Sequence, residues 1–186
     1  IDDLAAAIDP AAYGGFNLVV GDFRAGQWAW LSNRSPHAPH TDKAVARLHQ
    51  RRLAPGVYGL SNAALDTPWP KTERLRAAMR HALNSPEADG AQALLISALA
   101  DTAHAPPHLQ PVTGVAPDLE RALSSSFVDM AERGYGTRSS LIARVRPGQD
   151  TAWHLDLSEW THPGPSGTKR HGWGTQPPVR MQLAWV

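Results

Sequence analysis

Cysteine is absent from the 186 residues of this chain. This absence excludes disulfide bonds, thiolate zinc sites and a cysteine nucleophile within these residues. A marked excess of one charge is absent as well, because 18 lysines and arginines stand against 17 aspartates and glutamates. Neutralising a phosphate backbone requires clustered positive charge. We therefore expect no nucleic-acid partner.

Long hydrophobic runs are also missing. The longest apolar stretch, residues 91–100, is about half of the ~20 residues that a helix needs to cross a bilayer, and Gln92 and Ser97 interrupt it. We therefore expect no membrane span. Residues 1–4 contain no initiator methionine, and no basic segment or apolar signal core follows. We expect upstream residues to be missing, and a cytoplasmic location because no signal directs the chain elsewhere.

Apolar periodicity predicts helices in several places. Spacings of three and four residues over 75–83 predict a helix with one buried face, with Arg74, Arg76 and Arg80 pointing elsewhere. A second helix over 87–100 is apolar on most faces, which suits burial between layers. Residues 4–8 end a helical pattern that Pro10 stops, and residues 118–123 predict one or two helical turns.

Compact or alternating apolar runs predict strands. These runs are 16–20, 27–31, 57–60, 141–145, 152–157 and 181–185. Residues 33–55 are interpreted as a surface loop with a single helical turn, and the Gly/Pro-rich residues 162–178 as irregular. Strands joined by hairpins, with helices grouped between them, favour a layered α+β domain over a parallel sheet.

The domain organisation follows from these patterns. We expect residues 1–160 to be the C-terminal portion of a single domain, 161–178 an irregular segment and 179–186 a terminal strand.

Most familiar site motifs are absent, including glycine-rich phosphate loops, the His-Glu-x-x-His zinc motif and the nucleophile elbow. Two pairs of histidines are spaced three or four residues apart, His37 with His40 and His104 with His108. On a helix either spacing would direct both rings of a pair to one side. Both pairs lie in proline-interrupted loops, where solvated histidines are the alternative. We expect no metal site.

The string over residues 59–62 and 66–71 is the most particular in the chain. Asn62, at the exit of an expected strand, could direct its amide toward a developing oxyanion. The alternative is that Asn62 closes a turn and that Asp66 or Thr67 caps the next helix.

A second string, residues 135–140, precedes a predicted strand. Arg138 could place its planar guanidinium on a carboxylate or hold a catalytic group. The alternative is an ion pair beside a glycine turn.

Together, residues 56–62 and 65–71 resemble the signature of the NRDE family, which includes the transport and Golgi organization 2 proteins. Residues 15–22, 31–34 and 135–140 agree in order, so the resemblance covers about residues 4–157. Family members begin with Met-Cys and an apolar strand, followed by an Asn-Arg-Asp-Glu motif. Neither feature occurs here, and we interpret the chain as truncated, split or partly represented at its N-terminus.

The resemblance implies an N-terminal-nucleophile-hydrolase-like fold, an αββα sandwich of two antiparallel sheets between helices, incomplete here at its N-terminus. In that chemistry a terminal cysteine attacks an amide carbonyl and its own amino group serves as base. By analogy with the choloylglycine-type acylases, Asn62 is the oxyanion donor, and Arg138 positions the nucleophile or substrate. The ligand-binding residues expected from the resemblance are Asn17, Asn33, Asp66, Trp69 and Tyr135.

The resemblance also implies haem handling. Haem needs an apolar slot and an axial ligand or an arginine for a propionate. His154 is the least loop-bound histidine, but it falls opposite Trp153 and Leu155 on its strand, so a packed or solvated side chain is the alternative. We expect haem binding or trafficking without catalysis, with haem as a bound ligand and no required cofactor. The alternatives are a cysteine-nucleophile hydrolase of acyl amides, whose nucleophile precedes residue 1, and a catalytically inactive interaction domain.

Overall fold

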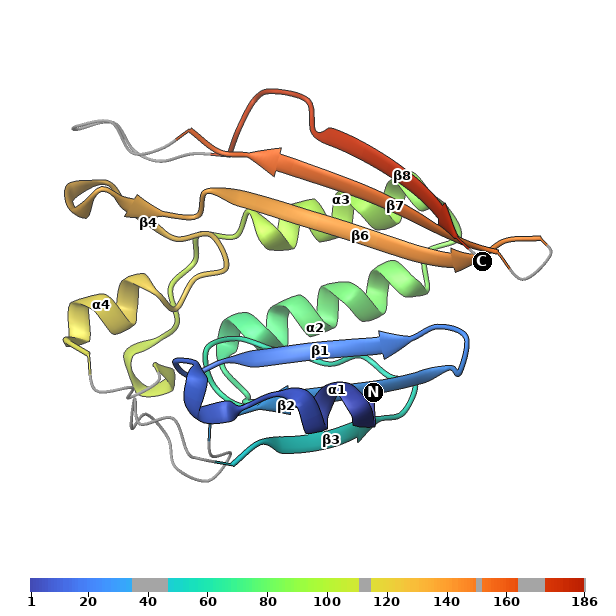
Figure 1. Cartoon of the computed structure of the whole chain (residues 1–186). Helices are drawn as coiled ribbons and strands as arrows, with labels where there is room; N and C mark the ends of the chain where they lie inside the picture. Colours follow the sequence, from blue (N-terminus) through green and yellow to red (C-terminus); the bar gives the residue numbers. More distant parts are fainter. Residues whose placement is uncertain (35–46, 111–114, 150–151, 164–172, 186) are drawn as a thin grey trace.

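The computed structural model describes residues 1–34, 47–110, 115–149, 152–163 and 173–185. Within them the chain forms two three-stranded antiparallel sheets, a two-stranded ribbon and helices (Figure 1). The expected α+β class is confirmed. The direct stacking of the two sheets between helices, which the hydrolase resemblance implies, stays a prediction.

The first sheet has the order β1-β2-β3. Its strands are Asn17–Asp22, Gln27–Ser32 and His49–Leu53. The expected hairpin of β1 and β2 is confirmed, and Gly26 adopts the left-handed φ of +62° at its turn. The surface loop predicted over 33–55 is wrong for residues 49–53, because these residues form a third strand that pairs with β2. Its side chains are mainly polar, so backbone pairing specifies the strand without apolar alternation.

Helix α1 (Asp2–Ala7) is held against one face of this sheet. Asp2 accepts hydrogen bonds from Gln50, at 3.1 Å, and from Arg52, two side chains that share a face of β3. The hydrogen bond from Gln50 and the charge of Arg52 lower the pKa of the exposed Asp2 carboxyl. As expected, the helix ends before Pro10, which begins the 3-10 turn η1 (Pro10–Ala12).

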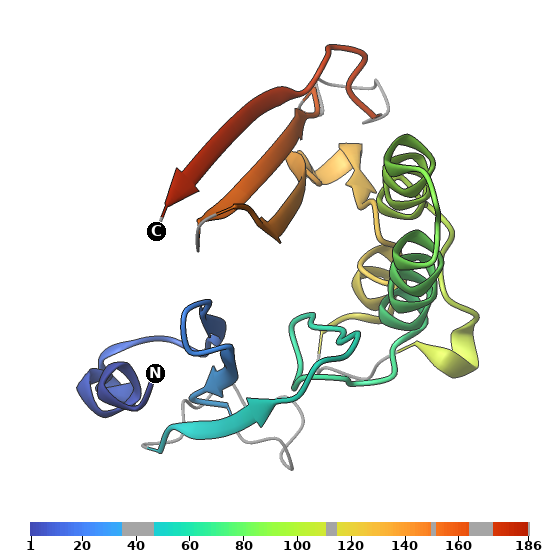
Figure 2. The same cartoon turned by 90° about the vertical axis from the view of Figure 1, so that its right-hand side faces the viewer.

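Two longer helices, α2 (Pro70–Leu83) and α3 (Ala88–Leu99), run beside each other along one side of the molecule (Figures 1 and 2). Both predicted helices are thereby confirmed. Burial of α3 between layers is not, because Ala91 is the one buried residue of this helix and Leu94 is 43% exposed. Helix α3 lies at the outer side, where just one of its faces packs. Among the described residues, none of the helices has the length and apolar character required to span a membrane.

The strand expected over 57–60 does not form. The backbone of Gly59 instead bonds to Asp66, whose side chain accepts the Gly59 N–H at 2.9 Å. A side-chain acceptor thus takes the place of a neighbouring strand.

The second sheet has the order β6-β7-β8. Its strands are Ser139–Pro147, Trp153–Thr161 and Val179–Trp185. The first two are longer than predicted, and the expected strand near the end of the chain is present as β8. Of the segment expected to be irregular, residues 164–172 lie outside the described residues.

The two faces of the second sheet differ in polarity. Its register aligns Val145, Leu155 and Leu183 on one face, and Arg146, His154 and Ala184 on the other. On the polar face, hydrogen bonds from Gln182, at 2.8 Å, and from Arg146, at 3.2 Å, lower the pKa of the Asp156 carboxyl.

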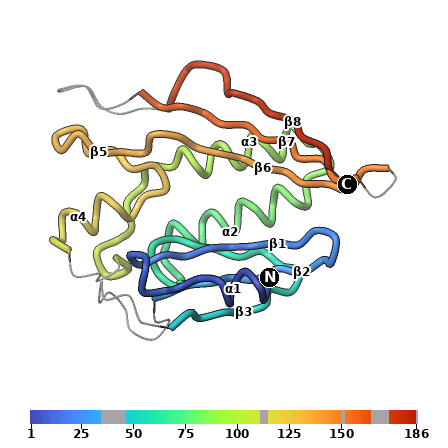
Figure 3. The backbone as a smooth tube through the Cα atoms, viewed as in Figure 1, coloured from blue at the N-terminus to red at the C-terminus, as the bar shows by residue number. Residues whose placement is uncertain are grey.

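Short elements connect the helices to the second sheet. They are η2 (Pro107–Leu109), α4 (Pro117–Ala122), β4 (Asp129–Met130), η3 (Ala131–Arg133) and β5 (Tyr135–Gly136). Helix α4 confirms the helical turns expected there. Figure 3 shows the β4–β5 ribbon leading directly into β6.

The two sheets meet at the turn between β1 and β2. Phe23 lies 4.8 Å from the Trp28 ring, 5.2 Å from Trp153 and 5.6 Å from Trp185, measured between ring centroids. These distances suit favourable aromatic packing. Helices α2 and α3 lie along one side of the two sheets (Figure 2).

Candidate functional site

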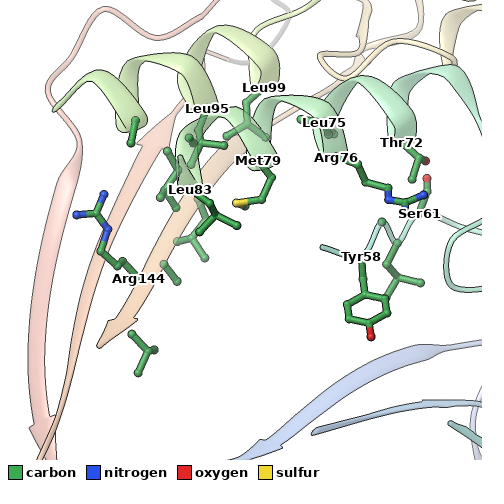
Figure 4. A pocket seen from close by; sticks show the side chains of 18 residues that line it. Tyr58, Ser61, Thr72, Leu75, Arg76, Met79, Leu83, Leu95, Leu99 and Arg144 are labelled. Carbon is green, nitrogen blue, oxygen red and sulfur yellow. The ribbon is translucent and has the colours of Figure 1, made fainter. Parts of the chain in front are cut away.

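A cavity of about 530 Å³ lies between α2, α3 and β6, with residues 58–61 at one end (Figure 4). Pockets for small ligands usually enclose about 300–1,000 Å³ and are mainly apolar. Both the volume and the lining of this cavity suit a small-molecule ligand.

The apolar wall comes from side chains spaced one helical turn apart. Leu75, Met79 and Leu83 form one stripe of α2, and Leu95 and Leu99 form the facing stripe of α3. The sequence predicts the α2 stripe as a core face. In the structure Leu83 is 68% exposed and Met79 is 39% exposed, so this stripe is an accessible wall of the cavity.

The polar end of the cavity contains Arg76, Ser61 and Thr72 (Figure 4). The prediction that Arg76 points away from the apolar stripe is wrong, because Arg76 lines the same cavity as the stripe. Its Nη1 atom bonds to Glu73 at 2.8 Å, and its Nε atom lies 3.8 Å from Asp66 Oδ1. Among the described residues, that Nε atom is buried without a hydrogen-bond partner. Arg76 therefore combines a place in the cavity lining with an unsatisfied donor on the side of Asp66.

The second arginine of the lining behaves differently. Arg144 pairs in register with Asp156, on the polar face of the second sheet, and its charge contributes to lowering the pKa of the Asp156 carboxyl. Its guanidinium turns away from Met79 and the leucines (Figure 4). Arg76 is thus the arginine whose charge serves the cavity.

Asp66 closes the loop at the polar end. Its N–H donates to the Gly59 carbonyl at 2.7 Å, and its Oδ1 accepts the Gly59 N–H at 2.9 Å. It has φ +61°, which is uncommon for residues other than glycine, asparagine and aspartate. Neither Asp66 nor Thr67 caps α2, because Trp69 is the N-cap residue and Thr67 Oγ1 donates to the Ala64 carbonyl at 2.8 Å. Asp66 orders the loop beside Arg76.

Asn17 fastens the same loop to the first sheet. Its Nδ2 donates to the Ala63 carbonyl at 2.9 Å, and its Oδ1 accepts the Trp30 indole N–H at 3.0 Å. Both ends of the amide are thereby used in contacts within the chain.

Asn33 is fully buried at the end of β2. Its Oδ1 accepts the Phe16 N–H at 2.7 Å, and its Nδ2 lies 3.0 Å from the carbonyls of Pro10 and Gly14 and 3.3 Å from that of Tyr13. These contacts join the segment before β1 to the sheet.

Asn62, the expected oxyanion donor, is exposed on the turn next to Ser61, and its carbonyl accepts a hydrogen bond from Arg34 at 3.2 Å. Tyr135 is exposed on β5, and Arg138 is exposed directly before β6. The structure places none of the seven predicted site residues in the cavity lining, although Ser61 and Leu141 extend it close to Asn62 and Arg138 along the chain.

Trp69 and Lys71 lie where α2 begins. The Lys71 ammonium lies 5.7 Å from the Trp69 ring and donates to the Leu123 carbonyl at 2.8 Å. Burial lowers the pKa of Lys71, because the charged form loses hydration. These contacts tie the start of α2 to the end of α4.

His162 is a buried polar residue that the sequence analysis missed. Its Nδ1 accepts the Gly174 N–H at 3.0 Å, so neutral His162 carries its proton on Nε2, which lies 3.0 Å from Ser140 Oγ. The ring also packs on Phe127 and Trp173, at centroid distances of 5.0 and 4.5 Å. A period of two extended to residue 162 puts it on the same face as His154 and Asp156, so alternation alone gives no signal of its burial.

The other histidines are scattered. His154 lies on the polar face of the second sheet, and His104 and His108 are exposed around η2. His37 and His40 lie outside the described residues. Within the described ranges no three His, Asp or Glu side chains gather closely enough to hold a metal ion.

The antiparallel sheets, the closed loop over 59–66 and the adjoining cavity define an α+β domain with a cavity of small-molecule size. The chain belongs to the Transport and Golgi organisation 2 family, whose sequence model matches residues 2–154. It is 29% identical over 167 residues to the Transport and Golgi organization protein 2 homolog of Bos taurus, with 84% of this chain covered. The match covers 54% of that protein, so the chain spans about half the length of this curated relative. The resemblance identified from the sequence motifs is confirmed.

Proposed function

We propose that this protein binds haem in the cavity between α2, α3 and β6 and takes part in its cytoplasmic trafficking without catalysis. The observation that carries the proposal is an apolar cavity of about 530 Å³ with Arg76 at its polar end. Haem is a flat apolar macrocycle with two propionates at one edge, so it requires both features together.

Arg76 is the residue that would meet a propionate. Its Nε atom is buried and lacks a hydrogen-bond partner within the described residues. A carboxylate is the acceptor that a guanidinium satisfies best. Glu73 and Asp66 already hold the side chain in place, so little rotamer entropy remains to be lost on binding.

Two described lining residues, Met79 and Tyr58, have side chains of the kinds that ligate haem iron. The Tyr58 hydroxyl donates to the Ala54 carbonyl at 2.7 Å, whereas Met79 projects from the middle of the apolar stripe (Figure 4). Met79 is therefore the better candidate. Bound haem would supply a redox-active iron, and the leucines around it would exclude water.

The test is a spectral titration of the protein with haem. We expect a saturable shift of the Soret band, and Arg76→Gln should weaken binding about tenfold or more, which corresponds to one charge-assisted hydrogen bond. Met79→Leu should change the band position, because leucine cannot ligate iron. Arg80→Gln is the matched control, since Arg80 is exposed one turn further along α2 and outside the cavity lining.

The absence of a saturable Soret shift would overturn haem binding. Equal titrations for Arg76→Gln and Arg80→Gln would remove Arg76 from the site. Iron-free protoporphyrin IX separates the two contributions, because it retains the macrocycle and propionates but offers no metal to Met79.

Amide hydrolysis with a cysteine nucleophile is the alternative proposal. What supports it is the position of Asn62 directly after Ser61, at the polar end of the cavity. The nucleophile would have to come from residues preceding Ile1, because the chain contains no cysteine. An upstream gene sequence with no Cys, Ser or Thr after the initiator Met would end this proposal. If a nucleophile is present, acyl amide turnover unchanged in Asn62→Ala would remove Asn62 from the mechanism.

A further inference from the structure

A second pocket, of about 370 Å³, lies on the first sheet. It is formed by β2, β3 and the loop residues Ala64 and Leu65, and Trp30 contributes to its lining. Trp30 is 5% exposed and Leu65 is 9% exposed, so the base of the pocket is part of the packed interior.

Cationic and neutral nitrogen donors are concentrated on this side of β3. Arg47, His49 and Arg51 all line the pocket, and they occupy alternate positions of the chain. In β3 this alternation directs His49 and Arg51 to one face, and Arg47 lies in the bend that precedes the strand. The intervening side chain of Gln50 and the next one, Arg52, both bond to Asp2 on the opposite face.

The pocket contains an unsatisfied polar atom. The Nε2 atom of His49 is buried and has no hydrogen-bond partner in the part of the chain that the structure describes. A buried nitrogen in this condition costs about 1–3 kcal/mol unless a ligand or water satisfies it.

The positive charge is only partly compensated within the described residues. Arg51 Nη1 lies 3.7 Å from Asp66 Oδ2, and its side chain is 53% exposed. A pair this long and this exposed contributes little, and the Arg51 guanidinium also lies 5.8 Å from the centroid of the Tyr58 ring. Turning toward a ligand would give up these two weak contacts. Arg47 is exposed at the rim.

We infer that this pocket binds the oxyanion group of a small molecule, a phosphate or a carboxylate. Arg47 and Arg51 supply charge and N–H donors, and His49 Nε2 supplies a third donor in the tautomer or charge state that carries its proton. Trp30 and Leu65 provide an apolar base for the remainder of the ligand. The lining residues of this pocket differ from those of the haem cavity, and Asp66 lies between the two, 3.7 Å from Arg51 and 3.8 Å from Arg76. The inference does not depend on haem binding.

The test uses inorganic phosphate and acetate as separate probes, titrated into the full chain and followed by isothermal calorimetry and amide NMR shifts. We expect saturable binding of at least one probe, with shifts confined to β2, β3 and residues 64–65. Tighter phosphate binding assigns a phosphate ligand, and tighter acetate binding assigns a carboxylate.

Two variants test the donors. Arg47→Gln combined with His49→Phe should weaken binding about tenfold or more. Neither substitution removes a hydrogen bond that the fold uses in the described structure, so folding should persist, as far-ultraviolet circular dichroism can verify. Arg52→Gln is the matched control, because Arg52 is on the same strand but faces Asp2. It should change affinity less than about twofold.

Absence of saturable binding by both probes would overturn the inference. Equal weakening by Arg52→Gln and by the double variant would also overturn it, since this would show nonspecific attraction to positive charge. Haem titration of the double variant should match that of the unmodified chain, which keeps failure of this site distinguishable from failure of the haem proposal.

Discussion

Gly59 and Asp66 hold each other through two hydrogen bonds, one from the Gly59 N–H to Asp66 Oδ1 at 2.9 Å and one from the Asp66 N–H to the Gly59 carbonyl at 2.7 Å. This pair closes the loop that ends at α2 and brings Asp66 near Arg76. The most specific motif of the sequence therefore has a structural role that can be measured apart from any ligand.

Asp66→Ala should lower the free energy of unfolding by about 1–3 kcal/mol, because the buried Gly59 N–H loses its acceptor. Alanine also fits poorly at the φ of +61°. Asp66→Asn should lower the free energy of unfolding by less, since asparagine retains an acceptor oxygen and tolerates this backbone region. Urea denaturation of the three proteins measures the difference. Equal stability of Asp66→Ala and the unmodified chain would contradict the closed loop.

Gly59→Ala should destabilise the protein by about 1–3 kcal/mol through overpacking. A Cβ atom at this position would overlap Thr72 Cγ2 and approach Arg76 Cδ to 2.9 Å. Thr72→Ser removes that methyl group, so it should restore part of the loss when combined with Gly59→Ala. A double-mutant cycle in urea measures the coupling. Strictly additive losses would show that Thr72 is not the obstacle.

Asn33→Ala should lower the free energy of unfolding by about 2–4 kcal/mol, because it removes a fully buried amide and leaves the Phe16 N–H without its acceptor. Asn62→Ala is the matched comparison on an exposed turn and should change stability by about 0.5 kcal/mol or less. Thermal and urea unfolding of both variants can check this contrast. Similar losses at the two positions would refute the anchoring role assigned to Asn33.

Lys71 predicts a pH dependence at the alkaline end. Burial lowers its pKa below the ordinary 10.5, so the folded chain releases this proton at a lower pH than the unfolded chain. While the unfolded chain binds more protons, stability rises with pH, and this rise ends near 10.5. Urea midpoints measured over this range should show a smaller rise for Lys71→Met. An unchanged slope in that variant would assign the rise to other groups.

Local patterns predicted much of the fold. The β1–β2 hairpin and helix α2 were predictable because their apolar periodicity and turn residues are local in sequence. Strand β3 was not, because His49 and its polar neighbours pair through the backbone and leave no apolar alternation. The strand expected over 57–60 failed for a related reason, since the bond between Gly59 and Asp66 is specified by a side chain seven residues away.

The candidate site was predicted less well than the fold. Asn17, Asn33 and Asp66 are particular residues, and the structure uses each to bond backbone groups. Spacing alone does not distinguish such anchoring from ligand binding. The helical pattern of α2 assigned Arg76 to another face, but its side chain bends toward Gly59, where the missing Cβ leaves room. The direction of the Arg76 side chain depends on tertiary contacts, which the periodicity of a single helix cannot predict.

The aromatic cluster at Phe23 has a consequence for biosynthesis. Its members come from opposite ends of the chain, with Trp28 on β2 and Trp185 at the end of β8. Contacts between residues this distant in sequence close late, because the intervening chain must first be ordered. On the ribosome the β1–β2 hairpin can form early, but the contact between Phe23 and Trp185 must wait until β8 has emerged. Tryptophan fluorescence during translation would record this closure as a step later than formation of the hairpin.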